Sequence, residues 1–269
     1  MVPMFLLVSS TIVAHCAGVT LLAAQEEVKM VEHPMYPHMG VLDRARLYMF
    51  LANATNYREF GSGGSTVQAA TRFKNIQKIV VSESDNKFVH YLLGRSDLRR
   101  EAASGRLVLR HADVGPVRGW GFPKDRSHVK QWPAYSSYNN SMAEFDPPFW
   151  FDMVFVDGRF RVACLLKALK ATPSDRVDQT VFAVHDYKSR AYRTTEEMEE
   201  SSQTISFFAN RFVIRPENIP QKWHDESRKG VVEDNLNEED NTLALFRKKK
   251  DFDESKLDAA IAKYELQFD

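Results

Sequence analysis

The sequence predicts an α/β fold with a mostly parallel sheet that is covered by helices on both faces. Short apolar segments alternate with segments of helical periodicity from residue 57 onwards. The apolar runs VFVDG at 154–158 and VFAVH at 181–185 are typical of central parallel strands, which are buried on both sides. No repeat of 20–50 residues is apparent. About 230 residues follow the N-terminal segment, which is a usual size for one domain.

The first half of the chain predicts helix and strand in alternation. Its helical segments carry apolar residues at spacings of three and four, and its strand segments are short and rich in β-branched or aromatic residues. A glycine-rich turn, GSGGS, joins the first strand to the second helix. In chain order we expect helix 41–54, strand 57–60, helix 66–73, strand 78–83, helix 85–103 and strand 106–115.

The second half continues the alternation and then departs from it. In chain order we expect strand 151–158, helix 159–171, strand 180–187, helix 194–211, and strands 211–216 and 241–250. No long helix separates the last two strands, so one of them is expected to run antiparallel at the edge of the sheet. The acidic segment 224–241 is expected to be an exposed loop. The tail 251–269 is expected to be a surface helix or to be frayed.

The N-terminal segment 1–25 contains no Asp, Glu, Lys or Arg and is long enough to cross a bilayer. It predicts a signal peptide that ends near Ala23 and Ala24, or an uncleaved membrane anchor. Either alternative would place the protein in the secretory pathway or at a membrane. A buried helix or a misplaced start codon is the competing interpretation. Residues 26–40 are then a linker, 41–250 the folded domain and 251–269 the tail.

The overall charge and the cysteine count exclude several classes of function. The 36 basic residues balance the 36 acidic ones, which argues against nucleic acid as a partner bound by bulk electrostatics. Cys16 and Cys164 are too few for a disulfide framework or a thiolate zinc site. Any metal in this chain would therefore need carboxylate or imidazole ligands.

The glycine turn and an acid after it suggest a nucleoside site. Glycines let the backbone turn tightly and let a ligand approach it, and the helix that follows offers free N–H groups. Glu83 lies 22 positions after Gly61, at the end of the next strand, where a carboxylate can accept the hydroxyls of a ribose. Asp113 is placed to meet an adenine ring or a neighbouring loop, and a turn role is its alternative. GSGGS departs from the pattern G-x-G-x-x-G, so NAD or FAD is the less favoured ligand.

Four segments, YREFGSGGST, VVSESD, HADVG and VFVDGRFRVAC, resemble the successive motifs of class I S-adenosylmethionine-dependent methyltransferases. They occur in the order of that family over about residues 41–250. Within the superfamily they are similar to a methyltransferase-like group with a G-x-W-G-x-P loop and a V-D-G-R-F-R turn. The resemblance implies a Rossmann-like sheet of seven strands, with the last strand inserted antiparallel, and S-adenosyl-L-methionine as the cofactor.

The resemblance also implies roles for individual residues. Glu83 would bind the ribose, Asp113 would lie on the adenine side, and Asp157 would face the methionyl and sulfonium region. The residues implied to surround the methionine part of the cofactor are Glu59, Gly61, Ser62, Gly63, Gly64 and Ser65.

Chemically useful side chains follow the two central strands, at the edge where ligands of open α/β sheets bind. His185 has an ordinary pKa of about 6.5, which suits a general base. Asp157 and Asp186 are alternative bases or metal ligands. Arg159 and Arg161 can bind an acidic substrate through paired hydrogen bonds, and we expect one of the two to form a structural salt bridge.

A divalent metal is not favoured at this edge. Asp157 and Asp186 resemble, in position, two acids that bind a divalent ion in catechol-type O-methyltransferases. The next ligand of that family is an Asn, and Tyr187 stands at the corresponding position here. A phenol is a poor replacement for an amide oxygen around a hard cation.

The predicted function is the transfer of a methyl group to a small-molecule or glycan-like acceptor. The connection 116–150 mixes aromatic and basic residues, which suits a planar, sugar or anionic acceptor, although a self-packed lid is the alternative. Two other functions remain open from the sequence. One is a non-catalytic domain that binds a nucleoside, and the other is an NAD(P)-dependent oxidoreductase.

Overall fold

The computed structural model describes residues 34–137, 150–187, 195–230 and 242–267. The predicted signal peptide or anchor at 1–25 lies outside these residues. Within the described ranges, no helix combines the length and the apolar character that a membrane crossing requires.

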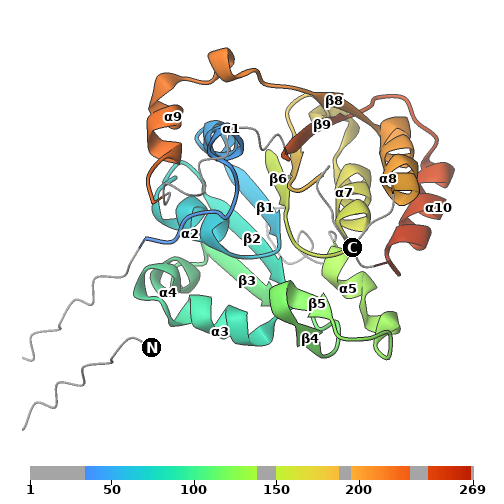
Figure 1. Ribbon diagram of the computed structural model, residues 1–269, viewed down its shortest axis with the longest axis horizontal. Coiled ribbons are helices and arrows are strands. Elements are labelled where there is room, and N and C mark those ends of the chain that lie inside the picture. The colour runs from blue at the N-terminus through green and yellow to red at the C-terminus, as the bar shows by residue number, and fades with distance from the viewer. Residues whose placement is uncertain (1–33, 138–149, 188–194, 231–241, 268–269) are drawn as a thin grey trace, which may run out of the picture. The chain divides into compact units, whose positions relative to one another are not determined.

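A single large sheet organises the described part of the chain, as Figure 1 shows. Its order is β3-β2-β1-β6-β7-β9-β8, and the first five of these strands are mutually parallel. In chain order, the seven strands are β1 (Asn56–Phe60), β2 (Lys78–Glu83), β3 (Leu107–His111), β6 (Met153–Val156), β7 (Val181–Val184), β8 (Ala209–Phe212) and β9 (Ala244–Lys248).

The prediction of a seven-stranded, mostly parallel sheet with an inserted antiparallel strand is confirmed. β9 runs antiparallel to both β7 and β8 and lies between them. The expectation that the antiparallel strand lies at the edge is therefore wrong, because the edge strand is β8. Strand order depends on pairing between distant segments, which the local pattern of residues does not encode.

Both faces of the sheet are buried, because alternate residues of each central strand enter different cores. On β6, Met153 and Phe155 pack into one cluster, whereas Val154 and Val156 pack into the other. Helices α1 (Val41–Leu51), α2 (Gly64–Thr71), α3 (Asn86–Gly94), α4 (Ser96–Ala103) and α9 (Gln221–Ser227) cover the first face. Helices α5 (Pro133–Ser136), α7 (Arg161–Ala171), α8 (Thr195–Phe208) and α10 (Glu254–Tyr264) cover the second.

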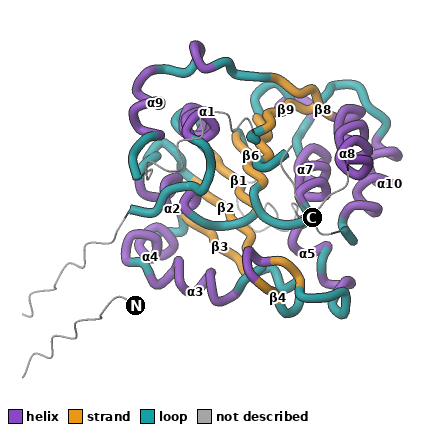
Figure 2. Tube along the Cα trace, in the orientation of Figure 1, coloured by secondary structure: helices purple, strands orange, loops and turns teal. Residues whose placement is uncertain are grey.

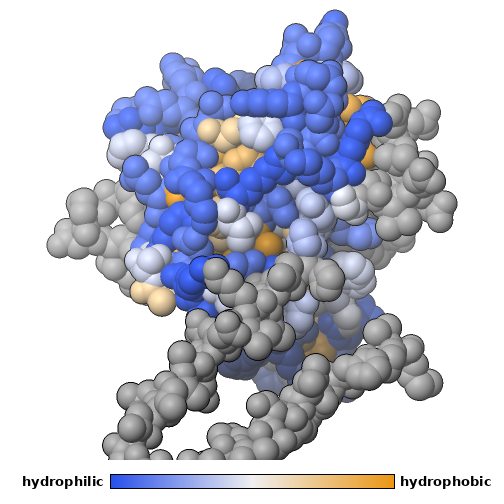
Figure 3. Space-filling view, turned by 90° about the vertical axis from the view of Figure 1, so that its left-hand side faces the viewer, coloured by the Kyte–Doolittle hydropathy of each residue, from blue (hydrophilic) through white to orange (hydrophobic). Residues whose placement is uncertain are grey.

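The face of the molecule drawn in Figure 3 is mostly hydrophilic where it is coloured, as expected when the apolar side chains are buried between the sheet and its helices. Its hydrophobic side chains form small separate patches. The four acids Glu196, Glu197, Glu199 and Glu200 of α8 are exposed, as expected of a solvated helix face.

Three predicted elements differ from those in the structure. The expected helix 85–103 is two helices, because Arg95 is extended (φ −66°, ψ 134°) after Gly94, a weak helix former. The expected strand 211–216 is β8, which begins at Ala209, directly after α8. The expected loop 224–241 begins inside α9, because Trp223 packs against Tyr48 and Phe73. Residues 231–241 lie outside the described residues.

The C-terminal tail forms a helix, as expected, and it also contributes to the core. Leu257, Ile261 and Tyr264 of α10 are buried in the cluster that contains α7. α10 therefore packs as part of the domain rather than as a separate tail.

The described part of the connection 116–150 carries short elements, visible as small helical and strand pieces in Figure 2. β4 (Val117–Arg118) pairs antiparallel with β5 (Phe122–Pro123) around a single helical turn, Gly119–Gly121. A second turn, Val129–Gln131, leads into α5. Residues 138–149 of this connection lie outside the described residues.

Candidate active site

The glycine turn between β1 and α2 touches the turn that follows β6. Gly61 has φ +90°, a conformation that L side chains rarely adopt. A Cβ on Gly61 would stand 2.6 Å from the Cα of Gly158, and a Cβ on Gly158 would stand 2.8 Å from the Cα of Gly61. The two turns therefore come this close only because both residues are glycine.

The other two glycines of the turn have different surroundings. A Cβ on Gly63 would meet nothing within 4 Å, so the turn is open on that side. A Cβ on Gly64 would lie 2.0 Å from the backbone oxygen of Tyr36. Gly64 is thus explained by packing against the segment before α1, whereas Gly63 leaves space beside the N-terminus of α2.

Glu59 and Ser65 lie behind the turn. Glu59 is fully buried and accepts hydrogen bonds from the hydroxyls of Ser65 and Thr66, the latter at 2.7 Å. Burial raises the pKa of Glu59 to about 8; the hydroxyl bonds oppose that change, and the charges of Asp157 and Glu83 add to it. Glu59 is therefore neutral at pH 7 and stabilises the turn from beneath.

Replacement of Glu59 by Gln is expected to remove a pH-dependent loss of stability. A carboxyl whose pKa is higher in the folded state binds more protons there, so stability falls as pH rises from about 4.5 to about 8. At about 1.36 kcal/mol per pKa unit, the loss amounts to a few kcal/mol. Urea unfolding at pH 6 and pH 8.5 should show a smaller decline for Glu59→Gln than for wild type. Equal declines would contradict a neutral Glu59.

Glu83 ties the first β–α turn to the second. Its Oε2 accepts from the backbone N–H of Ser62 (2.9 Å) and from the Ser62 hydroxyl (2.7 Å). Its Oε1 accepts from the backbone N–H groups of Ser84 (2.7 Å) and Asp85 (2.9 Å). Both carboxylate oxygens of Glu83 therefore accept from protein donors, and one donor to Oε2 is a side-chain hydroxyl.

Asp113 lies two residues beyond β3 and is exposed. Its Oδ1 accepts from the backbone N–H of Gly115 at 2.9 Å, which is the bond of a turn-forming Asp. The turn role therefore has direct support, and a role beside adenine stays a prediction.

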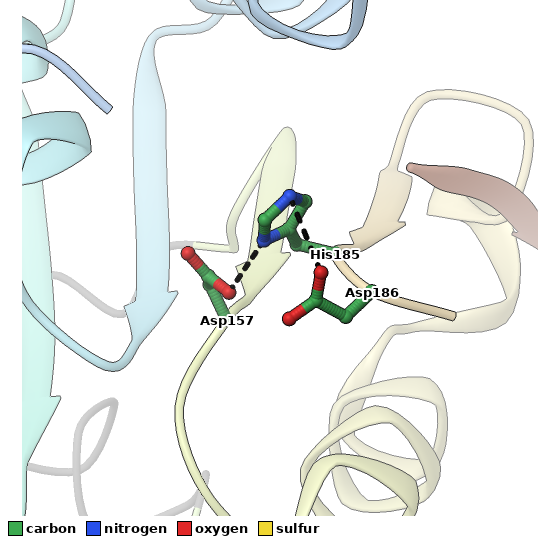
Figure 4. A group of neighbouring side chains, drawn as sticks. All are labelled: Asp157, His185 and Asp186. Carbon is green, nitrogen blue, oxygen red and sulfur yellow. Dashed lines mark hydrogen bonds and ion pairs between the residues drawn. The ribbon is translucent and has the colours of Figure 1, made fainter. Parts of the chain in front are cut away.

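A second group of side chains, Asp157, His185 and Asp186, lies at the ends of β6 and β7 (Figure 4). The parallel register pairs Val156 with Val184, so the residues that follow them become neighbours. Nδ1 of His185 lies 2.8 Å from Oδ1 of Asp157, and its Nε2 lies 3.7 Å from Oδ1 of Asp186. Asp186 has φ 52°, which Asp tolerates better than most residues.

Arg161 connects the two carboxylates of this group. Its buried guanidinium lies 3.4 Å from Oδ1 of Asp157 and 3.5 Å from Oδ2 of Asp186. It also donates to the backbone oxygens of Gly158 (2.9 Å) and His185. Arg161 is therefore the arginine that forms the expected structural salt bridge.

Arg159 packs against the hairpin that follows β3. Its side chain is buried, and its guanidinium lies 3.9 Å from the ring centroid of Phe122. Contact between Arg159 and an acidic substrate stays a prediction.

The carboxylates shift the proton affinity of His185. Burial lowers the pKa of His185, but the charge and hydrogen bond of Asp157, together with Asp186, outweigh both burial and Arg161. The net result is a pKa above the ordinary value of about 6.5. Burial raises the pKa of Asp157, whereas His185, Arg161 and Arg159 lower it, and the net direction is downward. Asp157 is therefore ionised wherever His185 titrates.

The cluster does not fit a magnesium-type ion. One ligand atom from each of Asp157, His185 and Asp186 lies within 4.8 Å of the others, but Arg161 already brings a positive charge to both carboxylates. Tyr187 directs its hydroxyl to Ser202 Oγ at 3.0 Å. A hard cation prefers a set of oxygen ligands, whereas one of these three groups offers an imidazole nitrogen and both carboxylates already face Arg161.

Two residues support the site in ways that the sequence did not predict: Arg58 was not considered, and Tyr135 was considered only as one of the aromatic residues of the connection 116–150. Arg58 lies fully buried in the middle of β1 and donates to Ser82 Oγ at 2.6 Å. Tyr135 accepts a hydrogen bond from the backbone N–H of Arg159 at 3.2 Å, beside the contact between the glycine turns. The charge within YREF is a signal for Arg58, whereas the aromatic character of the connection 116–150 does not predict the contact of Tyr135 with Arg159.

Comparison with known proteins establishes the fold. Neither a protein-family model nor a curated protein matches this sequence. A methyltransferase-like protein from Silicibacter pomeroyi DSS-3 is 20% identical, covers 87% of this chain and 98% of its own, and has a TM-score of 0.57. An O-methyltransferase from Bacillus cereus in complex with SAH is 13% identical, with coverages of 77% and 79% and a TM-score of 0.40.

The first similarity shows that this chain has the Rossmann-like fold of that protein.

Proposed function

We propose that this protein is an S-adenosyl-L-methionine-dependent methyltransferase that acts on a small-molecule or glycan-like acceptor. One observation supports the proposal most. A glycine turn with a buried carboxylate, Glu83, stands at the same edge of the sheet as the His185–Asp157 pair. This arrangement supports a nucleoside site and a proton acceptor at one edge of a Rossmann-like sheet.

The residues of the turn fit the proposed cofactor. Gly63 leaves open space at the N-terminus of α2, and a negatively charged carboxylate is favoured beside such a terminus. Once the Ser62 side chain rotates, Oε2 of Glu83 accepts a ribose hydroxyl. When bound, the cofactor supplies an electrophilic methyl group on a sulfonium and leaves as a neutral thioether.

The His185–Asp157 pair would accept the proton that the acceptor loses. With Nδ1–H donating to Asp157, the neutral imidazole has its lone pair on Nε2. Nε2 is 3.7 Å from Asp186, which is longer than a hydrogen bond, so it is available to an acceptor hydroxyl or amine. The proton moves to Nε2 as the acceptor atom bonds to the methyl carbon. Asp157 and Asp186 then stabilise the protonated ring.

Titration calorimetry and a transfer assay test the proposal. The full chain is titrated with S-adenosylmethionine, SAH and NAD(P), and transfer of a labelled methyl group is measured on phenols, catechols and sugars. Binding of SAH together with transfer is the expected result. Binding without transfer across the panel favours the non-catalytic alternative. Binding of NAD(P) alone favours an oxidoreductase.

Replacement of Gly63 by Val is expected to block the cofactor while the protein still folds. The new side chain enters the open space beside the turn, where the ligand would lie. We expect a loss of at least about tenfold in SAH affinity with little change in Tm. Gly94→Val is a matched control, because Gly94 is also open but lies at the end of α3. Retained affinity in Gly63→Val would mean that the turn is purely structural.

A further inference from the structure

The sheet ends at β8, which has a neighbouring strand on one side only within the described part of the chain (Figure 1). The N–H of Lys249 donates to the backbone oxygen of Phe208 at 2.8 Å. Bonded and non-bonded pairs alternate along an antiparallel ladder, so Asn210 and Phe212 bond to β9, whereas Arg211 directs its N–H and C=O away from it. Backbone groups at such an edge can pair with another strand.

The same edge carries a local excess of positive charge. Segments 209–215 and 244–250, which contain β8 and β9, hold six basic residues and no acid. The chain as a whole is balanced, with 36 basic and 36 acidic residues, so this charge is a local feature of the edge. The exposed members of the six are Arg211, Arg215, Arg247 and Lys250.

Nearby acids neutralise part of this charge. Nζ of Lys250 lies 2.7 Å from Oδ2 of Asp178. The guanidinium of Arg215 lies 3.9 Å from Oε1 of Glu217, and Asp251 follows the basic run directly. The other basic side chains contact backbone oxygens or an aromatic ring, which carry no net charge; they are Arg211, Arg247, Lys248 and Lys249. Six basic groups against these three acids leave the edge positive.

Apolar side chains lie at both ends of the edge strand. Phe207, before β8, and Val213, after it, are 65% and 68% exposed. A cavity of about 660 Å³ lies beside the strand, and its lining includes Phe212, Ile214 and Arg247. Exposed apolar groups that are gathered in this way often mark a binding surface. The edge thus offers backbone bonds, positive charge and apolar contacts to one extended partner.

This surface is separate from the candidate active site. Asp178, which lines the cavity, precedes β7, whereas His185 follows that strand. The cavity therefore lies toward the end of the sheet opposite to the His185–Asp157 pair. β8 is also four strands from β1, which leads into the glycine turn. A partner bound along β8 leaves that turn accessible.

We propose that β8 binds an acidic segment of another protein, which adds to the sheet as a further strand. The N–H and C=O of Arg211 bond to the backbone of that segment, and its carboxylates face the basic side chains of the edge. Positive charge at a sheet edge deters neutral or basic strands, so the same cations select an acidic one. A nucleic acid or an anionic membrane would meet the charge but has no strand to pair with the backbone.

Fluorescence anisotropy of a short labelled peptide tests this proposal on the full chain. In the probe Glu alternates with Thr, and in its matched control Lys alternates with Thr. We expect the Glu peptide to bind and the Lys peptide not to bind. The double variant Arg211→Glu/Arg215→Glu should weaken binding at least about tenfold, because it sets like charges against each other. Arg99→Glu/Arg100→Glu, the same change of charge on exposed positions of α4, should bind like wild type.

A second pair of variants isolates the backbone contact. Arg211→Ala and Arg211→Pro both remove the cation, but the proline also removes the N–H that points away from β9. An edge strand tolerates proline at such a position. We expect the affinity for the Glu peptide to be about 2- to 12-fold lower for Arg211→Pro than for Arg211→Ala, the effect of one lost hydrogen bond. Circular dichroism checks that both variants fold.

Several results would overturn the proposal. Wild type that does not bind the Glu peptide, or a double variant that binds it as well as wild type, excludes an acidic partner at this edge. Equal affinities of Arg211→Ala and Arg211→Pro exclude strand addition. Binding of single-stranded DNA or of anionic vesicles that the Glu peptide does not displace assigns the charge to those partners instead. If Arg211→Pro does not fold, the double variant and its α4 control still decide. None of these measurements involves SAH or methyl transfer, so a failure here leaves the proposed function standing.

Discussion

Replacement of His185 by Gln is expected to lower kcat/KM for methyl transfer by about 10²- to 10⁴-fold, the range that a general base contributes. The Gln amide is not a base, so it cannot take the proton of the methyl acceptor as Nε2 of the His185 imidazole would. Cofactor affinity should change little, because His185 belongs to β7 and not to the glycine turn. Parallel measurements of the transfer rate and of the Kd for SAH separate the two effects. A variant that keeps full activity would contradict the base role.

The pH profile gives a second measure of the same role. Only the neutral imidazole is a base, and the pKa of His185 lies above its ordinary value, so kcat/KM should rise with pH through a pKa above about 6.5. Asp157→Asn removes the strongest of the effects that raise the pKa of His185. Burial, Asp186 and Arg161 then remain as the effects on that pKa. Because burial lowers the pKa, the acidic limb should move to lower pH. Asp175→Asn, at an exposed acid, is the control and should not move it.

Replacement of Glu83 by Ala is expected to weaken SAH binding by about 1.5–3 kcal/mol, roughly 10- to 150-fold, because the charged acceptor proposed for a ribose hydroxyl is lost. Tm should fall as well, since the N–H groups of Ser62, Ser84 and Asp85 lose their partner. Calorimetry well below the new Tm isolates the binding effect. An unchanged Kd would refute the ribose role.

Ser62→Ala is the matched variant for Glu83. It removes the hydroxyl that lies on Oε2 and leaves the backbone bond of Ser62 to the same oxygen. The ligand no longer has to displace a protein donor, so we expect the affinity for SAH to be retained or raised. A loss as large as that of Glu83→Ala would mean that the carboxylate acts through the turn rather than on the ribose.

Much of the fold could be predicted from local patterns. β2 has the predicted bounds, Lys78–Glu83, because a run of β-branched residues ends at a charged one. The place of β9 between β7 and β8 could not be predicted from such patterns, since it depends on pairing across the chain. α9 was missed because its anchoring contacts, from Trp223 to Tyr48 and Phe73, lie far away in sequence.

Some features of the candidate site could likewise be predicted from the sequence, and others could not. Asp157 and His185 could be expected to meet, because each follows a central parallel strand. The bond from Ser62 to Glu83, the burial of Glu59 and the double contact of Arg161 depend on side-chain rotamers in the packed structure. Residue order alone does not specify those rotamers.

The contact between Gly61 and Gly158 has a mechanical consequence. The main chain itself, rather than adjustable side chains, fixes the spacing between the turn that follows β1 and the turn that follows β6. A displacement of one of these turns would displace the other, so the position of neither turn can change independently. Diversification towards new acceptors would therefore have to arise in peripheral loops, with the central junction kept rigid.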